Sequence, residues 1–419
     1  MTAVSQETVL IIGAGIIGIA CAHFLSKAGF KVTVIDKGTI AGACSHGNCG
    51  HILPSHVLPL NSPEAFKKGL CSLLNPKAPF RVRPQFRPNF LNWFWQFGRH
   101  CFGSHQSYAA KNLFHLLTSS ADAYDALIQG SDLQCDWQRS GLLYLFRSDR
   151  ALKSFSRTNE WLLSEHNLGA RELSTGELKA KHPSLSDDLA GGLFYEQDAS
   201  LRPDLLSRAW SNNLMSEGVA FFENCEFLSL SRQKKTIDTV YTTRGEFNAD
   251  HVVLAAGAMS CDFAKTFDCK IPVEPGKGYS VTYRRPPKHM DESIVLPERS
   301  LAVTSFKDHI RLGSMMEFVG FDESLSGQRI SQLRQSVQPY FKYEITGREE
   351  ESWFGWRPMT WDGLPIIGRA PNIDNAYLAT GHNMIGMMSA PATGKLIAEI
   401  IGQKKTHIEC EAYAPSRFN

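Results

Sequence analysis

The sequence predicts an α/β protein in which a Rossmann-like domain is interleaved with an α+β domain built on an antiparallel sheet. Three observations support this fold class. A strand, a glycine loop and a helix follow one another near the N-terminus, two similar strands ending in small residues occur far downstream, and the long segments between them lack this pattern. Because strands of the first kind are dispersed along the chain, we expect two intertwined domains.

The first element is a βαβ unit, TVLIIGAGIIGIACAHFLSKAGFKVTVIDK. Its glycines follow the pattern GxGxxG directly after a buried strand. The first permits a tight turn, the second lets backbone approach a pyrophosphate, and the third allows close helix packing. Helix amides face the phosphates, and an acidic residue after the second strand can accept both ribose hydroxyls. The predicted dinucleotide contacts are Gly13, Gly15, Ile16, Ile17, Gly18, Asp36 and Lys37.

Two later segments return to the same dinucleotide. DHVVLAAGAMS contains a short apolar strand and then small residues up to Gly257, past which a cofactor could lie close to backbone. AYLATGHNMIGMMSAPATGKLIAEII contains a strand, a glycine loop and an amphipathic helix. A chain that contacts a dinucleotide at its start, middle and end indicates a long, buried cofactor, which favours FAD over NAD.

Composition argues against several other classes of protein. The 419 residues are 43% hydrophobic, which is enough for more than one core, and 44 Lys and Arg against 42 Asp and Glu give a formal charge of +2. We therefore expect no nucleic-acid partner. The ten cysteines form no CxxC pair or zinc-ligand cluster, so we expect no metal and a cytoplasmic location. The apolar stretch at residues 9–20 is too short and too rich in glycine to span a membrane.

Four motifs resemble those of one family: GAGIIG near the N-terminus, SHGNCGHI at residues 45–52, GKGYS at 276–280 and WFGWRPMTWDGLPIIG at 353–368. On these motifs the sequence resembles, over essentially its whole length, the D-amino-acid dehydrogenase branch of the D-amino-acid-oxidase-like FAD-dependent oxidoreductases. The resemblance implies a GR2-type flavoprotein with non-covalent FAD. It also implies an FAD-binding domain of residues 1–60, 200–270 and 351–419, with a substrate-binding domain of residues 61–199 and 271–350.

The resemblance assigns two further loops to the cofactor. In the family, the loop GACSHGNCGHI passes along the pyrophosphate and the flavin ring, which implies FAD contacts for Ser45, Asn48 and Gly50. His51 is expected at the ring edge or the substrate, the alternative being an exposed side chain in a solvated turn. The C-terminal loop would hold the pyrimidine edge of the flavin, with His382 as a cofactor contact and not a catalytic base. Its predicted contacts are Gly381, His382, Met384, Ile385 and Gly386.

Arg357 is the leading candidate to bind a substrate carboxylate, because it stands where the family pattern G-x-R-P places such an arginine. A guanidinium fork gives a carboxylate two charge-assisted hydrogen bonds. The alternative is a structural ion pair with Asp362. Tyr279 is a second candidate, which could donate to the carboxylate or line the pocket, the alternative being core packing. Arg202 is a weaker third, which could instead hold a surface turn. With His51 at the flavin edge, these assignments complete the expected substrate site.

Two segments lack dinucleotide signatures. GYSVTYRR, SLAVTSF and HIRLGSMMEF alternate apolar and polar residues, which predicts an antiparallel sheet covering the flavin. PNFLNWFWQFGRHCF predicts a helix with four aromatic residues on one face, namely Phe90, Trp93, Phe94 and Phe97. This stripe is expected in the core, the alternative being a patch that docks on a membrane surface or a partner.

The expected activity is oxidation of a D-amino acid to its imino acid by hydride transfer to flavin N5, with electrons passed to a quinone or another non-oxygen acceptor. A cyclic substrate such as D-proline or hydroxy-D-proline fits this scheme. One alternative is an oxygen-using amine oxidase of the glycine or sarcosine oxidase type, and another is a non-catalytic dinucleotide-binding module. In glycine oxidase the C-terminal loop resembles G-H-F-R-N-G, whose arginine contacts the substrate. Met384 stands at that position, which points away from glycine oxidase.

The expected partners are therefore an amino-acid substrate and an electron acceptor. Contact with the inner face of the plasma membrane is an open alternative for an enzyme that reduces a quinone, and the oligomeric state is left open.

Overall fold

A computed structural model describes residues 6–418 except residues 74, 76, 77 and 132. One layer is a six-stranded sheet in the order β19-β20-β13-β1-β2-β9, in which β1, β2, β9, β13 and β20 run parallel and β19 is antiparallel. Its strands come from the start, the middle and the end of the chain. They are β1 (Thr8–Ile12), β2 (Lys31–Ile35), β9 (Ala220–Phe222), β13 (His251–Leu254), β19 (Ile366–Arg369) and β20 (Ala376–Thr380).

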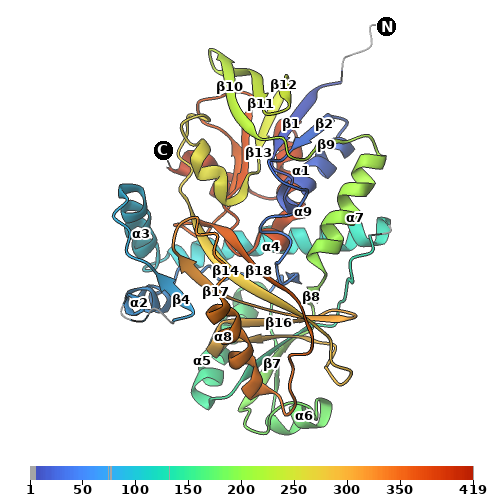
Figure 1. Cartoon of the computed structure of the whole chain (residues 1–419). Helices are drawn as coiled ribbons and strands as arrows, with labels where there is room; N and C mark the ends of the chain where they lie inside the picture. The colour runs from blue at the N-terminus through green and yellow to red at the C-terminus, as the bar shows by residue number, and fades with distance from the viewer. Residues whose placement is uncertain (1–5, 74, 76–77, 132, 419) are drawn as a thin grey trace.

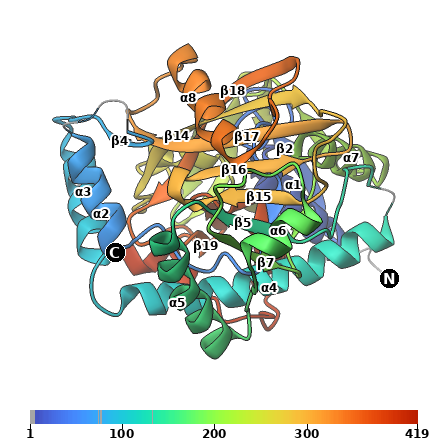
Figure 2. The same ribbon diagram turned by 90° about the horizontal axis from the view of Figure 1, so that it is seen from below.

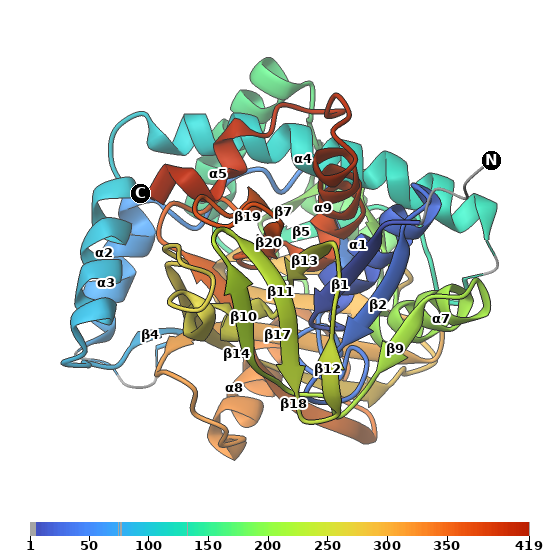
Figure 3. The same cartoon turned by 90° about the horizontal axis from the view of Figure 1, so that it is seen from above.

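Two helices cover one face of this parallel sheet. α1 (Ile16–Lys27) follows the first glycine loop, and α9 (Gly386–Ile401) follows the last one. They pack so closely that a Cβ built on Gly394 of α9 would lie 2.4 Å from the carbonyl oxygen of Ala20. Figure 3 shows α1 and α9 side by side next to the sheet. The N-terminal βαβ unit and the C-terminal strand, loop and helix are thus confirmed, and their strands belong to one sheet.

The second layer is a mixed, mainly antiparallel sheet in the order β18-β14-β17-β16-β15-β5-β7-β6, with β4 paired to β17. The predicted strands of the second half are confirmed as β14 (Val273–Arg284), β16 (Leu301–Ser305) and β17 (His309–Phe318). The remaining strands are β4 (Phe80–Val82), β5 (Leu142–Phe146), β6 (Arg171–Leu173), β7 (Gly191–Tyr195), β15 (Ser293–Leu296) and β18 (Glu349–Thr360). Helix α8 (Gly327–Val337) covers one face of this sheet (Figure 2).

Smaller elements complete the chain (Figure 1). A long helix, α4 (His105–Gly130), packs on α9, where the Tyr124 hydroxyl donates to the Met387 carbonyl oxygen at 2.6 Å. The other helices are α2 (Pro63–Ser72), α3 (Pro88–His100), α5 (Asp149–His166), α6 (Thr175–Lys181) and α7 (Pro203–Ser216). The other strands are the pair β3 (His51–Ile52) and β8 (Ala199–Ser200), and the sheet of β10 (Phe227–Gln233), β11 (Thr236–Thr242) and β12 (Gly245–Phe247).

The predicted domain ranges cross these layers at two places. Strand β18 pairs along its whole length with β14, so the predicted boundary at residue 351 falls inside the mainly antiparallel sheet. Helix α4, which belongs to the predicted substrate segment, packs against α9 of the parallel layer. The domain division therefore stays a prediction, while the α/β architecture of two interleaved layers is observed.

The aromatic stripe of α3 lies in the core as expected, except that Phe94 is only half-buried. Phe90, Trp93 and Phe97 are 2–3% exposed, and the Trp93 indole N–H donates to the carbonyl oxygens of Pro272 at 3.1 Å and Met359 at 3.2 Å. These side chains pack against Met316 and the neighbouring apolar residues of β17 and β18. The inner face of α3 is therefore structural.

Candidate active site

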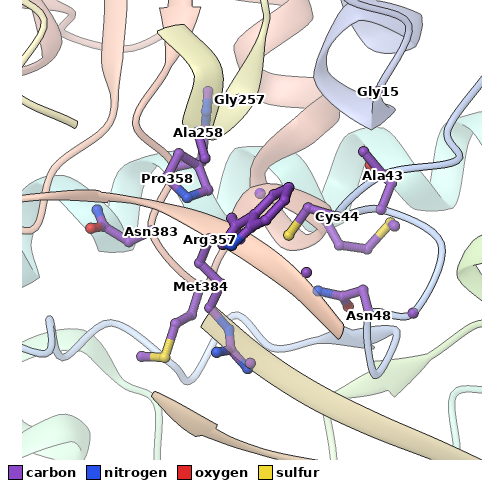
Figure 4. A pocket seen from close by; sticks show the side chains of 18 of the residues that line it. Gly15, Ala43, Cys44, Asn48, Gly257, Ala258, Arg357, Pro358, Asn383 and Met384 are labelled. Carbon is purple, nitrogen blue, oxygen red and sulfur yellow. The ribbon is translucent and has the colours of Figure 1, made fainter. Parts of the chain in front are cut away.

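A cavity of about 1270 Å³ lies between the two layers. Its walls include the residues that follow the parallel strands, the loop at residues 42–49, and the facing residues of β14, β17 and β18. Figure 4 shows Cys44 and Asn48 on one side of the pocket, with Asn383 and Met384 on the other. Ligands of open α/β sheets bind at the carboxyl ends of the strands, and this cavity occupies that place.

The glycines of the first loop differ in what surrounds them. Gly13 has φ +114°, and a Cβ there would lie 2.5 Å from the Ala255 carbonyl oxygen, so the turn requires glycine. At Gly18 a Cβ would lie 1.8 Å from the Gly13 carbonyl oxygen, which makes this residue a packing position between helix and loop. At Gly15 a Cβ would meet only the Ser45 Oγ, at 3.5 Å, so protein atoms alone leave room for a side chain at this cavity wall. That space suits a ligand.

The carboxylate of Asp36 lies at the far end of the same wall. Its oxygens accept hydrogen bonds from the backbone amides of Ala14 at 2.7 Å and Gly38 at 2.8 Å, which hold it at the end of β2. Lys37 lines the cavity beside it. A carboxylate fixed in this way keeps lone pairs that can accept ribose hydroxyls.

The loop after β2 is held by a residue that the sequence analysis did not select. Arg311 of β17 is 1% exposed, and its guanidinium donates to the carbonyl oxygens of His46 at 2.9 Å and Asn48 at 2.8 Å. Ser45 Oγ accepts from the Ile16 amide at 3.0 Å, so the loop also reaches the start of α1. The sequence offered one signal that could have identified this residue. It is an arginine in the strand HIRLGSMMEF, in which most residues that face inward are apolar.

Several predicted cofactor contacts lie near the cavity without lining it. Gly50 has φ +72°, and a Cβ there would lie 1.8 Å from the Leu201 carbonyl oxygen, so this glycine serves packing against the segment after β8. Gly381 is a turn residue with φ +70°, and Ile385 is a core residue beside a smaller cavity. The cavity walls omit these residues and Gly18, whereas the other predicted contacts line them, namely Gly13, Gly15, Ile16, Ile17, Asp36, Lys37, Ser45, Asn48, Gly257, His382, Met384 and Gly386.

His51 is buried at the cavity wall, which corrects the alternative of an exposed turn residue. It is 5% exposed, and its Nε2 lies 3.0 Å from the Thr304 hydroxyl. Burial, with a smaller contribution from the nearby His56, lowers the pKa of His51 to about 3. The ring is therefore neutral at physiological pH and can exchange a hydrogen bond without adding charge.

His382 is likewise neutral. Its Nε2 lies 3.0 Å from the Thr393 hydroxyl of α9, and burial lowers its pKa to about 3. The ring therefore brings no positive charge to this wall of the cavity. Positive potential at this wall comes instead from the N-terminus of α9, where Gly386 and Met387 line the cavity.

Arg357 projects from β18 into the buried wall of the cavity (Figure 4). The alternative of a pair with Asp362 is wrong, because Asp362 accepts from the Arg417 Nε at 2.7 Å. Arg357 instead donates from Nη1 to the Met315 carbonyl oxygen at 2.7 Å. In the described part of the chain no carboxylate pairs with it, and burial lowers its pKa. The side chain is half-buried at the cavity wall, and a partly desolvated cation without a counter-ion favours an anionic ligand.

Two backbone features form a slot for this guanidinium. At Gly278 of β14 a Cβ would lie 2.1 Å from Nη1 and 2.4 Å from Cζ of Arg357, so only glycine lets the fork lie over the strand. Opposite, the pairing of β14 and β17 contains a bulge at which Met315 has φ +70°. The left-handed conformation of a non-glycine residue is strained, and here it sets the carbonyl that Arg357 contacts.

The hydroxyl of Tyr279 is occupied elsewhere. It donates to the Glu317 carboxylate at 2.7 Å, and this carboxylate pairs with Arg329 of α8 at 2.5 Å. Burial raises the pKa of Tyr279, which keeps the phenol protonated. Its single hydroxyl proton is therefore committed to Glu317 and not to a substrate carboxylate, while the residue itself lines the cavity.

The weaker candidate Arg202 is a structural residue. Its Nε donates to Asp204 at 3.2 Å and its Nη1 lies 3.3 Å from His309 Nδ1, and it does not line the cavity.

The cavity fits FAD along its length. Asp36 and the amides of α1 suit an adenosine and a pyrophosphate, and Gly257 has φ +55° with no atom within 4 Å of an added Cβ. At the other end the indole N–H of Trp356 is buried, lines the cavity and has no hydrogen-bond partner in the described part of the chain. An unpaired buried donor indicates a missing acceptor. Elsewhere in the described residues, no group of three His, Cys, Asp or Glu side chains could hold a metal ion.

Comparisons with known proteins agree with this geometry. The family model described as FAD dependent oxidoreductase (DAO) matches residues 8–400. The D-amino acid dehydrogenase of Vibrio atlanticus (strain LGP32) is 30% identical over 418 residues, which cover 98% of this chain and 99% of that protein.

Among solved structures, the glycine oxidase of Geobacillus kaustophilus has a TM-score of 0.81 at 21% identity, covering 98% of this chain and 99% of its own. The L-proline dehydrogenase of P. horikoshii has a TM-score of 0.75 at 20% identity, covering 99% and 98%. Both show the same fold. The chain therefore belongs to the DAO family of FAD-dependent oxidoreductases and is an enzyme that uses FAD.

Proposed function

We propose that the enzyme oxidises a D-amino acid to its imino acid and passes the electrons to a quinone or another non-oxygen acceptor. The observation that carries the proposal is Arg357, a half-buried guanidinium at the cavity wall with only the Met315 carbonyl oxygen as acceptor among the described residues. Its remaining donors suit the carboxylate of an amino acid. The Vibrio relatives named D-amino acid dehydrogenase support the choice of the D series.

The chain's own residues would bind and orient the substrate. Arg357 fixes the carboxylate, while Met384 and Met315 give the neighbouring wall an apolar surface. The neutral rings of His51 and His382 add no charge that would repel an ammonium group. When bound, the flavin of FAD supplies the hydride acceptor, and the protein excludes water and sets the approach of the substrate Cα.

Among D-amino acids, the apolar wall suits an apolar or cyclic side chain such as that of D-proline or hydroxy-D-proline. Met384 lies at the wall where the sequence pattern of glycine oxidase has an arginine. Without an arginine at the position of Met384, the carboxylate contact depends on Arg357 alone. This difference from glycine oxidase argues against glycine or sarcosine as the main substrate.

The test is anaerobic bleaching of the bound flavin by pairs of D- and L-amino acids and by N-methyl amines. We expect a D-amino acid to bleach the flavin fastest. Bleaching by L-amino acids or N-methyl amines, and by no D-amino acid, would overturn the proposal. Turnover with a quinone analogue, compared with turnover in dissolved oxygen, then identifies the acceptor.

A further inference from the structure

Helices α2 and α3 form an arm at the edge of the molecule, and the three views agree on its position away from the parallel sheet (Figures 1, 2 and 3). The two helices pack on each other through aromatic rings. Phe66 of α2 lies 6.1 Å from Phe94 and 5.8 Å from Phe102, measured between ring centroids. The buried face of α3 fixes this arm on β17 and β18, so its outward residues have a defined position.

The outward face of the arm is unusually apolar for a protein surface. Among the described residues, twelve large hydrophobic side chains are exposed, and six of them fall between residues 70 and 102. Trp95 is 67% exposed and Phe86 is 94% exposed. Leu91 and Trp95 are four residues apart on α3, which places them on one face of that helix, and Phe102 follows just after its end. We call this set the arm patch: Leu70, Leu73, Phe86, Leu91, Trp95 and Phe102.

The arm is also basic. Residues 63–102 contain seven Lys and Arg and one Glu, which gives a formal charge of 7 − 1 = +6, whereas the whole chain carries +2. Arg81 and Arg87 form ion pairs with Glu317 at 3.3 Å and Glu274 at 2.6 Å. The other described cations of the segment have no ion-pair partner within the described residues, and they are exposed: Lys67, Lys68, Arg83 and Arg99.

The cavity reaches the surface beside this arm. Glu64 and Lys68 of α2, with Pro79 before β4, are exposed and line the cavity. Leu325, which is also exposed, lines the cavity as well. An apolar molecule leaving a membrane at the arm would therefore meet the cavity mouth directly.

We infer that the arm patch docks the enzyme on the surface of an anionic lipid bilayer. Exposed Trp, Phe and Leu beside unpaired Lys and Arg suit the boundary between acyl chains and negatively charged headgroups. A second copy is a poorer occupant, because a two-fold dimer would place the unpaired Lys and Arg side chains of two arms against each other. A protein interface core is also usually depleted of Lys. The inference rests on the proposed function for the reason to approach a membrane, where a quinone resides.

In the described part of the chain, no helix is long and apolar enough to cross a bilayer. The contact would therefore be superficial, and it would depend on headgroup charge and ionic strength.

The test is flotation of the holoenzyme with vesicles. We expect the enzyme to float with vesicles of phosphatidylethanolamine and phosphatidylglycerol, to do so less at high salt, and to float poorly with phosphatidylcholine alone. The triple variant F86S/L91S/W95S should lose at least tenfold in binding, with unchanged FAD content and unchanged turnover with a soluble acceptor. L163S/L228S is the matched control, because these leucines are 53% and 59% exposed and lie outside the arm.

A second variant, K67E/R99E, tests the charge component without touching apolar residues, and it should also reduce binding to anionic vesicles. The inference is overturned if the wild-type enzyme does not bind anionic vesicles, or if the triple variant binds as well as the wild type. It is also overturned if the wild type is a dimer that the triple variant converts to a monomer, since the patch is then a self-interface. Flotation is measured without an amino acid. Its result therefore stays valid even if the enzyme does not oxidise the proposed substrate.

Discussion

The Arg357 guanidinium donates one hydrogen bond to the protein, and its other N–H groups are available to a ligand. Its contact with the Met315 carbonyl oxygen at 2.7 Å orients the fork, and no described carboxylate neutralises it. Replacement by Ala would leave a bound carboxylate buried and unpaired, which costs about 3 kcal/mol, or roughly a hundredfold in affinity. We expect Arg357→Ala to remain yellow and to raise the KM for the amino acid by that factor.

The matched variant is Arg357→Lys, which keeps the charge and loses the fork, and it should recover only part of the affinity. Steady-state kinetics over a wide range of substrate concentration measure both variants. An unchanged KM for Arg357→Ala would place the carboxylate elsewhere.

Gly278 tests the slot in which that guanidinium lies. An Ala at this position would put a methyl group 2.1 Å from Arg357 Nη1, and a flexible side chain can move away without unfolding the strand. We expect Gly278→Ala to lower kcat/KM at least tenfold, with near-normal thermal stability and FAD content. Binding of a carboxylate that lacks the amine, followed by the flavin spectrum, should weaken in parallel.

Gly327→Ala is the control for this substitution, because no atom lies within 4 Å of an added Cβ and its backbone is unstrained. If Gly278→Ala bound carboxylates normally, the fork would not depend on the slot.

At the level of elements, the contact between α1 and α9 joins the two ends of the cofactor site. α1 presents amides to one end of the cavity and α9 to the other, and Gly394 lets the two helices meet. A Cβ at Gly394 would lie 2.4 Å from the Ala20 carbonyl oxygen, which is backbone and cannot move aside. We expect Gly394→Ala to destabilise the protein by about 1–3 kcal/mol through overpacking and to weaken FAD retention.

Thermal melting and flavin release measure this effect. Gly130→Ala, at the exposed end of α4, meets no atom within 4 Å and should be neutral or slightly stabilising. Equal melting temperatures for Gly394→Ala and the wild type would show that the helices can separate at no cost.

The sequence predicted elements whose signals are local. GxGxxG after an apolar strand depends on neighbouring residues only, and the alternation in residues 278–318 predicted strands that are observed as β14, β16 and β17. The bulge at Met315 was missed because it arises from pairing between β14 and β17, two remote segments. The role of Arg311 was missed for the same reason, since its partners are carbonyl oxygens more than 260 residues earlier in the chain.

The site could be predicted only in part. The sequence gives the chemical type of each residue, but not the direction in which its side chain points. Arg357 and Tyr279 both line the cavity, as selected, but the Tyr279 hydroxyl donates to Glu317 and not to a ligand. On α3, the sequence drew attention to the aromatic stripe at Phe90 and Trp93, which is buried. The exposed face with Trp95 became visible only when the buried face was known.

At the scale of the whole molecule, both layers contribute to one cavity, so the groups buried between segments matter for stability. Asp198, on the turn between β7 and β8, is fully buried. One carboxyl oxygen accepts from the Ser55 hydroxyl at 2.6 Å, and the other has no partner in the described part of the chain. Burial raises the pKa of Asp198 to about 7 from its ordinary value of 3.8.

This shift predicts how stability depends on pH. Between pH 4 and 7 the folded protein keeps a proton on Asp198 that the unfolded chain has released, so this group makes stability fall as pH rises. The loss is about 1.4 kcal/mol per pH unit, or about 4 kcal/mol in total, and it levels off above pH 7. Asp198→Asn keeps the shape and cannot ionise. We therefore expect the variant to melt at higher temperature than the wild type at pH 8, with the two curves converging as pH falls toward 4. A difference that does not change with pH would mean that Asp198 is ionised in the folded protein, and that an unseen partner must offset its burial.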